Sequence, residues 1–253
     1  MPLLRPALPY LVSALLWALL TGIANLVWGP ALAPSPLAIS RALASLLFSG
    51  ELLRELWLTV YRGLAGVLLA NVAGALLGLA AGLAPFVLKV TAPLVAGLQS
   101  CPPIVWIALV LVWAGVGDFV PVATVFAATF PFVFSNVAQG TLGLSPRLLA
   151  MGRLYNVPRL RVLRRFVLPG ILPYYLAGLS TVLATGWKAA AVAEFLGSPD
   201  GAGARIYWSY SRLNMEELNA WALALIVLGL SLEAFLITPL RKKAASLASR
   251  GRA

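Results

Sequence analysis

The sequence contains no histidine, one cysteine and eight acidic residues in 253 positions. The absence of histidine removes the commonest general base and the commonest metal ligand. The single cysteine, Cys101, excludes an internal disulfide, and its neighbours show no metal-ligand spacing. Neither a nucleophile–base pair nor a metal cluster is visible. We therefore expect that the chain is not an enzyme and that it carries no metal and no cofactor of its own.

Glycine-rich phosphate-binding loops are also missing. The chain has no G-x-x-x-x-G-K-[ST] motif and no Gly-Lys pair at any position. The backbone cradle that ATP hydrolysis needs is therefore absent. Any use of ATP, with its magnesium ion, must take place on a separate protein.

Charge is scarce and apolar residues dominate. Charged residues make up 11% of the chain and hydrophobic residues 61%, against about 25% charged residues in ordinary soluble domains. Apolar runs of about 20 residues recur, and each is long enough to cross a hydrocarbon core of ~30 Å. The short alternating segments of a transmembrane barrel are missing. The composition predicts an all-α membrane protein.

Six membrane-spanning helices are predicted, at about residues 9–29, 57–84, 93–114, 119–142, 169–192 and 219–238. The chain is divided accordingly into the first helix with an external loop and a short interfacial helix (1–56), a core of five helices (57–240) and a basic tail (241–253). Ala31-Leu32-Ala33 has the small-x-small form of a cleavage site. Because Pro34 follows directly and the apolar stretch is long, we expect an uncleaved helix.

The basic residues predict the orientation. Six spans put both termini on one side, and with that side cytoplasmic the inner segments hold 13 of the 19 basic residues and no acidic residue. Lys and Arg accumulate in cytoplasmic segments. We therefore predict cytoplasmic N- and C-termini, and we attribute the net charge of +11 to topology rather than to nucleic-acid binding.

The predicted second helix carries Ala70, Gly74, Gly78 and Gly82 at four-residue spacing. Four residues turn an α-helix by about 400°, so these small residues form one slightly drifting stripe that another helix can approach closely. Packing within the chain is favoured over an interface between subunits.

The segment Ser145–Pro173 has six arginines and no acidic residue. Ser145-Pro146 is a good helix start, because the hydroxyl caps free amides and proline suits the first turn. Asn156 suits a left-handed C-terminal cap. Pro158 is expected to start a second short helix. Leu168-Pro169 is expected to end this helix and to begin the fifth span. The two short helices would form a compact knob at the membrane surface.

Within this knob Leu148, Met151 and Tyr155 fall at i, i+3 and i+7 and form a short apolar ridge. The ridge and the turn favour a fitted protein partner, because contact with lipid needs neither. The alternative is a positive loop that only follows the orientation rule and contacts anionic membrane lipids.

The loop resembles the EAA segment of permease subunits of ABC importers, the inner-membrane components of binding-protein-dependent transport systems. That segment ends in a G…(V/I)xLPxxLP pattern, and here the ending is Phe166–Pro173 with Asn156 at the usual glycine. Other stretches resemble the nitrate/sulfonate/taurine-type branch: Trp57–Gly66 (S/T-x-x-R-x-x-x-G), Gln99–Ile107 (L-x-x-(I)-P-P-x-A-W-I), and Ala193–Gly197 followed by Gly201–Gly203 (A-E-x-L-G…G-x-G).

The sequence departs from the family at Ala150-Met151-Gly152, which stands in place of Glu-Ala-Ala. The acidic residue is missing, so a salt bridge made by that glutamate is lost. Docking by shape and apolar contact remains available. Asn156 is tolerable in place of glycine because asparagine accepts left-handed geometry better than most residues.

The resemblance implies the type I ABC importer permease fold in a bacterial or archaeal plasma (inner) membrane. It implies a second permease subunit, by default in a homodimer, two ATPase subunits that carry ATP and magnesium, and an extracytoplasmic substrate-binding protein. The coupling loop, about 144–168, would contact the ATPase through these residues: Leu148, Met151, Gly152, Arg153, Tyr155, Asn156, Arg159 and Arg161. The solute expected from the branch is a small oxyanion or organosulfonate. The alternative function is a non-transporting membrane scaffold that docks a cytoplasmic partner or anionic lipid.

Candidates for the pathway are the few polar residues at membrane depth, which usually face a protein interior or a water-filled cavity: Gln99, Ser100, Asn136, Gln139, Thr181, Thr185 and Lys188. Helix packing is the alternative explanation for most of the hydroxyls. Pro102-Pro103 is expected to break the third helix near Gln99, which frees backbone groups that a cavity can satisfy.

Two charged residues have sharper hypotheses. Lys188 would attract an anionic substrate, and the alternative is that it snorkels to the outer interface about one turn away. Glu194, at the outer end of the fifth span, is the candidate for an outer gate, and the alternative is a plain interfacial acid.

Overall fold

Every secondary-structure element in the described residues is a helix. The structure is a computed structural model, and it describes residues 8–145 and 154–250. The helices in these ranges are α1 Leu8–Trp28, α2 Pro36–Phe48, α3 Glu51–Leu83, α4 Pro85–Ser100, α5 Pro103–Ala114, α6 Phe119–Leu142, α8 Arg159–Val162, the π-turn η1 Leu163–Val167, α9 Leu168–Gly197, α10 Ala202–Ser211, α11 Met215–Leu232, the π-turn η2 Glu233–Ile237 and α12 Thr238–Arg250. The prediction of an all-α protein is confirmed for this part of the chain.

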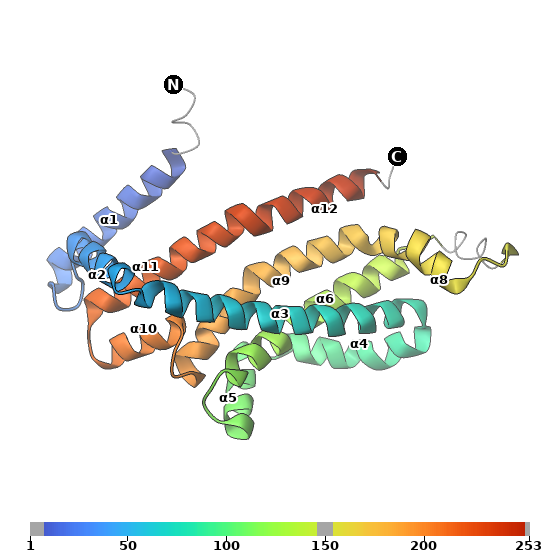
Figure 1. Cartoon of the computed structure of the whole chain (residues 1–253), viewed down its shortest axis with the longest axis horizontal. Coiled ribbons are helices and arrows are strands. Elements are labelled where there is room, and N and C mark those ends of the chain that lie inside the picture. Colours follow the sequence, from blue (N-terminus) through green and yellow to red (C-terminus); the bar gives the residue numbers. More distant parts are fainter. Residues whose placement is uncertain (1–7, 146–153, 251–253) are drawn as a thin grey trace.

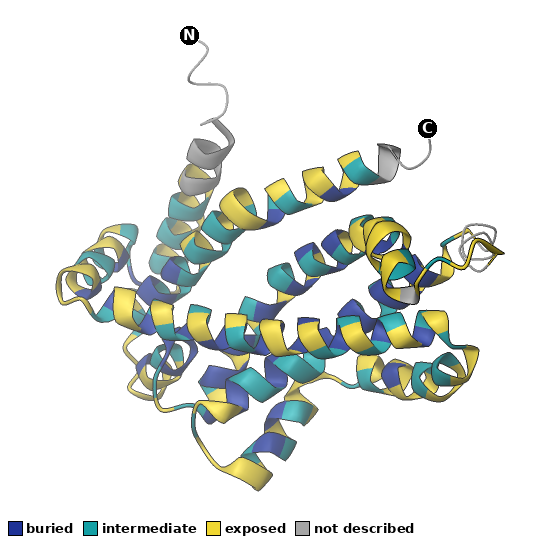
Figure 2. Cartoon of the chain, turned by 45° about the vertical axis from the view of Figure 1, so that its right-hand side comes forward, coloured by how far each residue is buried: buried dark blue, intermediate teal, exposed yellow. Residues whose placement is uncertain are grey.

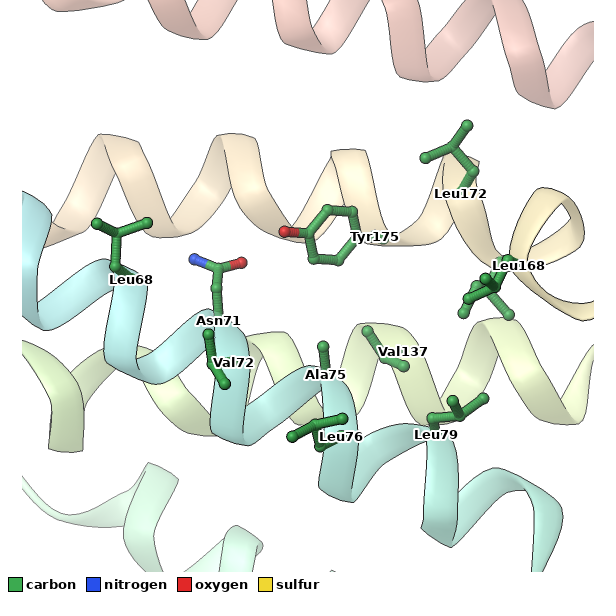
Figure 3. Close-up of a pocket in the computed structure, with 11 residues that line it drawn as sticks. Leu68, Asn71, Val72, Ala75, Leu76, Leu79, Val137, Leu168, Leu172 and Tyr175 are labelled. Atoms are coloured by element: carbon green, nitrogen blue, oxygen red, sulfur yellow. The ribbon is translucent and has the colours of Figure 1, made fainter. Parts of the chain in front are cut away.

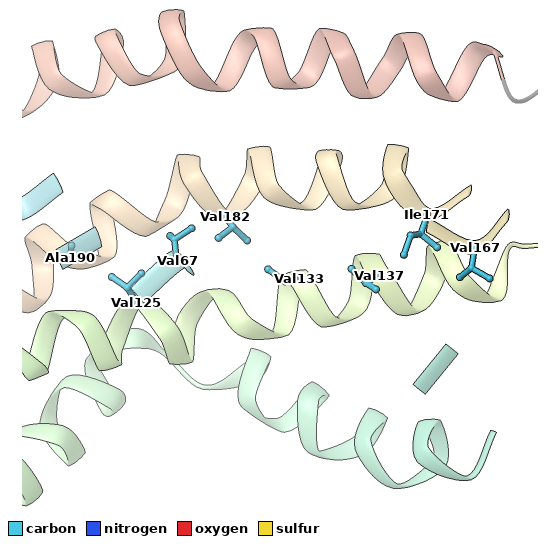
Figure 4. Packing of buried hydrophobic residues seen from close by; sticks show 8 residues of the cluster. All are labelled: Val67, Val125, Val133, Val137, Val167, Ile171, Val182 and Ala190. Atoms are coloured by element: carbon cyan, nitrogen blue, oxygen red, sulfur yellow. The ribbon is translucent and has the colours of Figure 1, made fainter. Parts of the chain in front are cut away.

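The core lies between α3, α6 and α9, which pack against one another and run side by side along the long axis (Figure 1). Branched aliphatic side chains fill the space between them, among them Val67 of α3, Val133 and Val137 of α6, and Val182 of α9 (Figure 4). The helices α4, α10 and α12 pack around this core. Their outward faces stay exposed (Figure 2).

Four helical stretches in the described residues are long and apolar enough to cross a membrane: Glu51–Leu83, Phe119–Leu142, Leu160–Gly197 and Met215–Leu247. The pair α4 and α5 counts as a fifth span if it is taken as one broken crossing. The described side chains of α1, Leu15–Trp28, form a shorter apolar helix. The helix α6 coincides with the predicted fourth span, whereas α3 begins at Glu51 rather than near residue 57.

The break predicted at Pro102-Pro103 in the span over 93–114 is confirmed, and the first half of that span begins earlier than predicted, at Pro85. The structure has two helices there, α4 and α5, which meet at an angle of 95°. Cys101 between them is extended, with φ −78° and ψ 122°. Proline lacks an N–H and disfavours helical geometry in the residue before it. Two consecutive prolines therefore end one helix and start the next in a new direction.

The prediction that a short helix ends at Leu168-Pro169 is wrong. The start predicted at Pro158 is confirmed by α8, but α8, η1 and α9 then form one continuous helix from residue 160 to Gly197. The N–H of Leu168 bonds to the carbonyl of Leu163 five residues earlier, which is π-helical bonding. This wider turn lets the helix continue past Pro169 instead of ending.

The same arrangement recurs near the C-terminus. The N–H of Thr238 bonds to the carbonyl of Glu233, and Pro239 follows. The region predicted as a separate basic tail therefore continues the last helix as α12, up to Arg250. Across the π-turn, Arg241 donates to Glu233 Oε1 at 2.8 Å.

The small-residue stripe on α3 packs within the chain, as predicted. Gly74 and Gly78 lie directly against α6, and a Cβ built on Gly78 would come within 2.7 Å of the Phe134 carbonyl oxygen. Ala70, on the same stripe, is fully buried. Glycine is required at such positions because the facing atom belongs to a backbone that cannot rotate away.

Replacing Gly78 with alanine should force α3 and α6 apart. We expect a loss of about 1–3 kcal/mol in the free energy of unfolding, the usual effect of overpacking, measured as a lower melting temperature of the purified chain in detergent. The matched control is Gly97→Ala on α4, where a Cβ meets nothing within 4 Å. If both variants melt like the parent, the stripe is not a tight contact.

Candidate functional site

Arg62 on α3 lies almost fully buried, with 1% of its side chain exposed, and is surrounded by carboxylates. Its Nη1 donates to Glu194 Oε1 of α9 at 3.0 Å and to the Asp200 carbonyl oxygen at 2.9 Å. Its Nη2 forms ion pairs with the side chains of Asp118 and Asp200. Asp118 precedes α6 and Asp200 precedes α10, so one guanidinium joins four separate parts of the chain.

Glu194 is completely buried and uses both of its carboxylate oxygens. Besides Arg62 on Oε1, its Oε2 accepts a hydrogen bond from Thr59 Oγ1 at 2.7 Å and one from the Gly203 N–H at 3.2 Å. Glu194 is therefore a buried, fully paired carboxylate, and its two predicted roles, outer gate and plain interfacial acid, stay predictions. The structure does not test its role as an outer gate.

Glu55, also completely buried, lies on α3 about two turns before Arg62. It forms a second centre of hydrogen bonds. It accepts hydrogen bonds from Arg205 at 2.8 Å, from Arg54 at 2.6 Å and from the Gly201 N–H at 2.6 Å. Glu55, Thr59 and Arg62 are spaced i, i+4 and i+7, which places all three on one face of the helix.

The first turn of α10 explains why these side chains converge. The N–H groups at the start of a helix have no intrahelical partner, and here Gly201 N, Ala202 N and Gly203 N are bound by Glu55, Thr59 and Glu194 respectively. No side chain of the loop itself caps α10. Negative charge is favourable at this end of a helix, so α10 is capped by two other helices.

Glycine is needed at two positions of this turn. Gly201 has φ +99°, a conformation that side chains with a Cβ rarely adopt. A Cβ on Gly203 would overlap the Ala191 carbonyl oxygen of α9. The motif A-E-x-L-G…G-x-G therefore supplies both the buried carboxylate and the close backbone approach, and the motif around Arg62 supplies the cation.

The polar pathway candidates are more exposed than Glu55, Arg62 and Glu194. Gln99 and Ser100 lie exposed at the end of α4, before the break. Asn136 is half-buried on α6, against Gly178 of α9, and its amide donates to the Phe132 carbonyl oxygen. Gln139 is exposed on α6.

On α9, Thr181, Thr185 and Lys188 share one exposed face, since they are spaced i, i+4 and i+7. The Lys188 ammonium lies 5.7 Å from the centre of the Trp187 ring. In the described residues, no hydrogen bond or ion pair joins Lys188 to Gln99 or Asn136. The pathway role of Lys188 and its alternative, snorkelling, both stay predictions.

The coupling residues are only partly within the described structure. Leu148, Met151, Gly152 and Arg153 lie outside the described residues, as does the side chain of Arg159. Tyr155 is exposed, and so is Arg161. Asn156 has φ +50°, which is the left-handed conformation predicted for it. The structure does not test the docking role of any of these residues.

The sequence reasoning missed Glu55 and Arg62 of the buried network, and it missed the more exposed residues that pair with that network, namely Asp118, Asp200 and Arg205. One signal was available: Arg62 stands in a long apolar helix, where an ionisable residue nearly always has a charged partner. Glu194 was the only acidic residue assigned to the fifth span, so the pair could have been proposed. The roles of Asp118 and Asp200 follow only from the fold.

Comparison with known proteins places the chain in a family. Residues 70–240 match the family model described as "Binding-protein-dependent transport system inner membrane component". The putative aliphatic sulfonates transport permease protein SsuC of Bacillus subtilis (strain 168) is 26% identical over 196 residues, 78% of this chain and 70% of that protein. The taurine transport system permease protein TauC of Escherichia coli (strain K12) is 28% identical over 152 residues, 58% of this chain and 55% of that protein.

A third relative is the nitrate import permease protein NrtB of Leptolyngbya laminosa, 27% identical over 174 residues, 68% of this chain and 61% of that protein. Among solved structures, a chain of the MetNI methionine ABC transporter in an inward facing conformation has a TM-score of 0.64 at 18% identity. The match covers 78% of this chain and 95% of that chain, and it shows a shared fold.

Removing the Glu194 carboxylate should destabilise the chain strongly. We expect Glu194→Ala to lower the free energy of unfolding by about 3–5 kcal/mol, because Arg62 keeps its burial and loses a partner. Glu194→Gln should cost less, since an amide oxygen can still accept from Gly203. Thermal unfolding in detergent measures both.

Glu216→Ala is the matched control, because Glu216 is exposed at the start of α11. Adding Arg62→Met to Glu194→Ala should cost less than the sum of the two single changes, since the second change removes the unpaired charge. Additive losses would show that the two residues do not interact.

Proposed function

The chain belongs to the family of binding-protein-dependent transport system inner membrane components, and we propose from this that two copies of it form the translocation pathway of an ATP-driven importer. The chain is the permease subunit of an ABC importer, a transport subunit rather than an enzyme. Family membership implies a separate ATPase subunit and a substrate-binding protein as partners. One chain would supply half of a pathway, and a second identical permease subunit would complete it.

We propose six membrane spans with both termini in the cytoplasm. The spans are α1, α3, the broken pair α4–α5, α6, the continuous helix from α8 through α9, and the continuous helix from α11 into α12. The charge distribution supports this orientation, since the inner segments hold basic residues and no acidic one. The buried network then lies at the outer ends of α3 and α9, and the basic loop lies inside. The membrane is the plasma membrane of a bacterium or archaeon.

The single observation that carries the mechanism is the continuous helix Leu160–Gly197. At 1.5 Å per residue its 38 residues span about 57 Å. One end adjoins the coupling loop and the other carries Glu194 in the buried network. A displacement of the loop by the ATPase therefore reaches the outer end of α9 through one rigid element, and this supports Glu194 as part of the outer gate.

We propose that the solute is a small oxyanion or organosulfonate. The relatives are named for aliphatic sulfonates, taurine and nitrate. On this chain, the exposed face of α9 with Thr181, Thr185 and Lys188 offers hydroxyls and one cation for an anionic solute, and Gln99 and Ser100 at the break after α4 and Asn136 on α6 add further polar groups.

The function is tested by purification with the partner proteins. The chain should co-purify with an ATPase subunit, and hydrolysis should rise when a loaded binding protein is added. The double variant Leu148→Asp/Met151→Asp should abolish this coupling, because two charges at the centre of an apolar interface typically weaken binding by more than 2 kcal/mol, about 30-fold.

The control is Leu213→Asp, because Leu213 is exposed on the proposed outer side and should leave coupling intact. The variant chains should still be found folded in the membrane. If the double variant couples normally, the ridge is not the docking surface. If the parent neither co-purifies with an ATPase nor stimulates hydrolysis, the scaffold alternative is favoured.

Replacing Lys188 with alanine should slow uptake of an anionic solute by about fivefold, the effect of one partly exposed ion pair of ~1 kcal/mol. Uptake is measured in vesicles that contain the assembled transporter, together with subunit assembly, which should not change. Arg212→Ala removes an exposed cation elsewhere and serves as the control. Unchanged uptake by Lys188→Ala would favour snorkelling.

A further inference from the structure

A groove of about 540 Å³ runs along the outside of the core between α3 and α9. Figure 3 shows its walls, which are apolar side chains from the two helices with Val137 of α6 at the base. The residues of α3 that line it run from Leu68 to Leu79, and those of α9 run from Leu168 to Tyr175. Apart from Val137 of α6, the whole lining comes from these two helices.

The length of the groove matches one leaflet of a bilayer. From Leu68 to Leu79 the helix α3 rises by about 16 Å, and half of a hydrocarbon core is ~15 Å. In the proposed orientation Leu79 and Leu168 lie at the inner interface. Leu68 and Asn71 then lie near the middle of the membrane. The groove therefore has the length of one acyl chain of the inner leaflet.

The inner end of the groove is basic. Arg164 precedes Leu168 by four residues, close to one helical turn, so it continues the line of the groove toward the cytoplasm. Arg165 is adjacent, and both arginines are exposed. Neither makes an ion pair with a residue of the described ranges 8–145 and 154–250. Two unneutralised guanidinium groups at this level match the phosphate of a lipid headgroup.

The opposite end of the groove is polar but uncharged. Asn71 is 7% exposed, and its Oδ1 is buried without a hydrogen-bond donor. Figure 3 shows the Asn71 amide and the Tyr175 hydroxyl pointing toward each other across the groove. The Asn71 Oδ1 can accept a hydrogen bond from a ligand donor. This end of the groove therefore tests which way an amphiphile lies.

We propose that this groove binds one anionic glycerophospholipid of the inner leaflet, with an acyl chain between α3 and α9 and the phosphate on Arg164 and Arg165. The site rests on the orientation given under the proposed function. Charge complementarity at the inner end and the one-leaflet length select this occupant. The lipid would lie along one side of the helix Leu160–Gly197, which connects the coupling loop to the buried network.

The experiment is a titration of the purified full-length chain in detergent with dioleoyl phosphatidylglycerol and, separately, with dioleoyl phosphatidylcholine, with bound lipid counted by native mass spectrometry. One phosphatidylglycerol should bind more tightly than phosphatidylcholine. Arg164→Gln/Arg165→Gln should remove this preference, since each basic residue near the surface contributes about fivefold. The control Arg41→Gln/Arg212→Gln removes two exposed arginines of the proposed outer side and should change nothing.

A second pair of variants tests the groove itself. Ala75→Trp places an indole inside it and should prevent binding of the one tight lipid, whereas Ala80→Trp adds the same bulk to an exposed position on the same helix that does not line the groove. Glycerol phosphate, the headgroup chemistry without chains, should not compete. Asn71→Leu should leave phosphatidylglycerol binding unchanged.

Equal binding of the two lipids, or normal binding by Ala75→Trp, would overturn the site. Loss of binding in Asn71→Leu but not in the arginine variant would also overturn it, because the amphiphile would then lie the other way. Lipid binding is measured without ATPase or nucleotide. Failure of coupling with normal lipid binding would therefore count against the proposed function alone.

Discussion

The fold around α10 depends on three backbone N–H groups that this helix cannot satisfy by itself. A buried helix terminus needs partners, and here they come from the side chains of two other helices. Two of those partners are carboxylates, and a buried carboxylate is costly unless it is paired. Arg62 and Arg205 supply the pairing. The position of α10 on α3 and α9 and the burial of Arg62 are thus consequences of one capping requirement.

This requirement gives the two sequence motifs a common explanation. Thr59 and Arg62 come from one motif, and Glu194, Gly201 and Gly203 from the other, more than 130 residues away along the chain. Each motif is incomplete alone, because one supplies the cation and a hydroxyl while the other supplies an acid and free amides. The continuous helix that starts beside the basic loop ends in this network, so the loop and the network share one element.

Features set by local chemistry could be predicted from the sequence, and features set by distant contacts could not. The bounds of α6, the left-handed Asn156, the break at Pro102-Pro103 and the packing of the glycine stripe all follow from short-range rules. The carboxylates around Arg62 depend on how four segments meet, and hydropathy carries no information on that. The continuation of the helices past Pro169 and Pro239 was not predicted. Proline ends an α-helix, but a helix can continue past a proline when the turn before it has π-helical hydrogen bonds.

The π-turns η1 and η2 determine how the side chains before each turn are rotated about the helix axis relative to those after it. A turn closed by a bond from residue i+5 holds one residue more than an α-turn, and one residue corresponds to about 100° around an α-helix. The arginines before η1 and the polar face of α9 after it are therefore related by an angle that the extra residue determines. The π-turn at Leu163–Val167 absorbs one residue more than an α-turn does, so the two faces meet at a different angle from the one that uninterrupted α-helical spacing would give. The register between the two faces is encoded by a residue count rather than by the identity of any side chain.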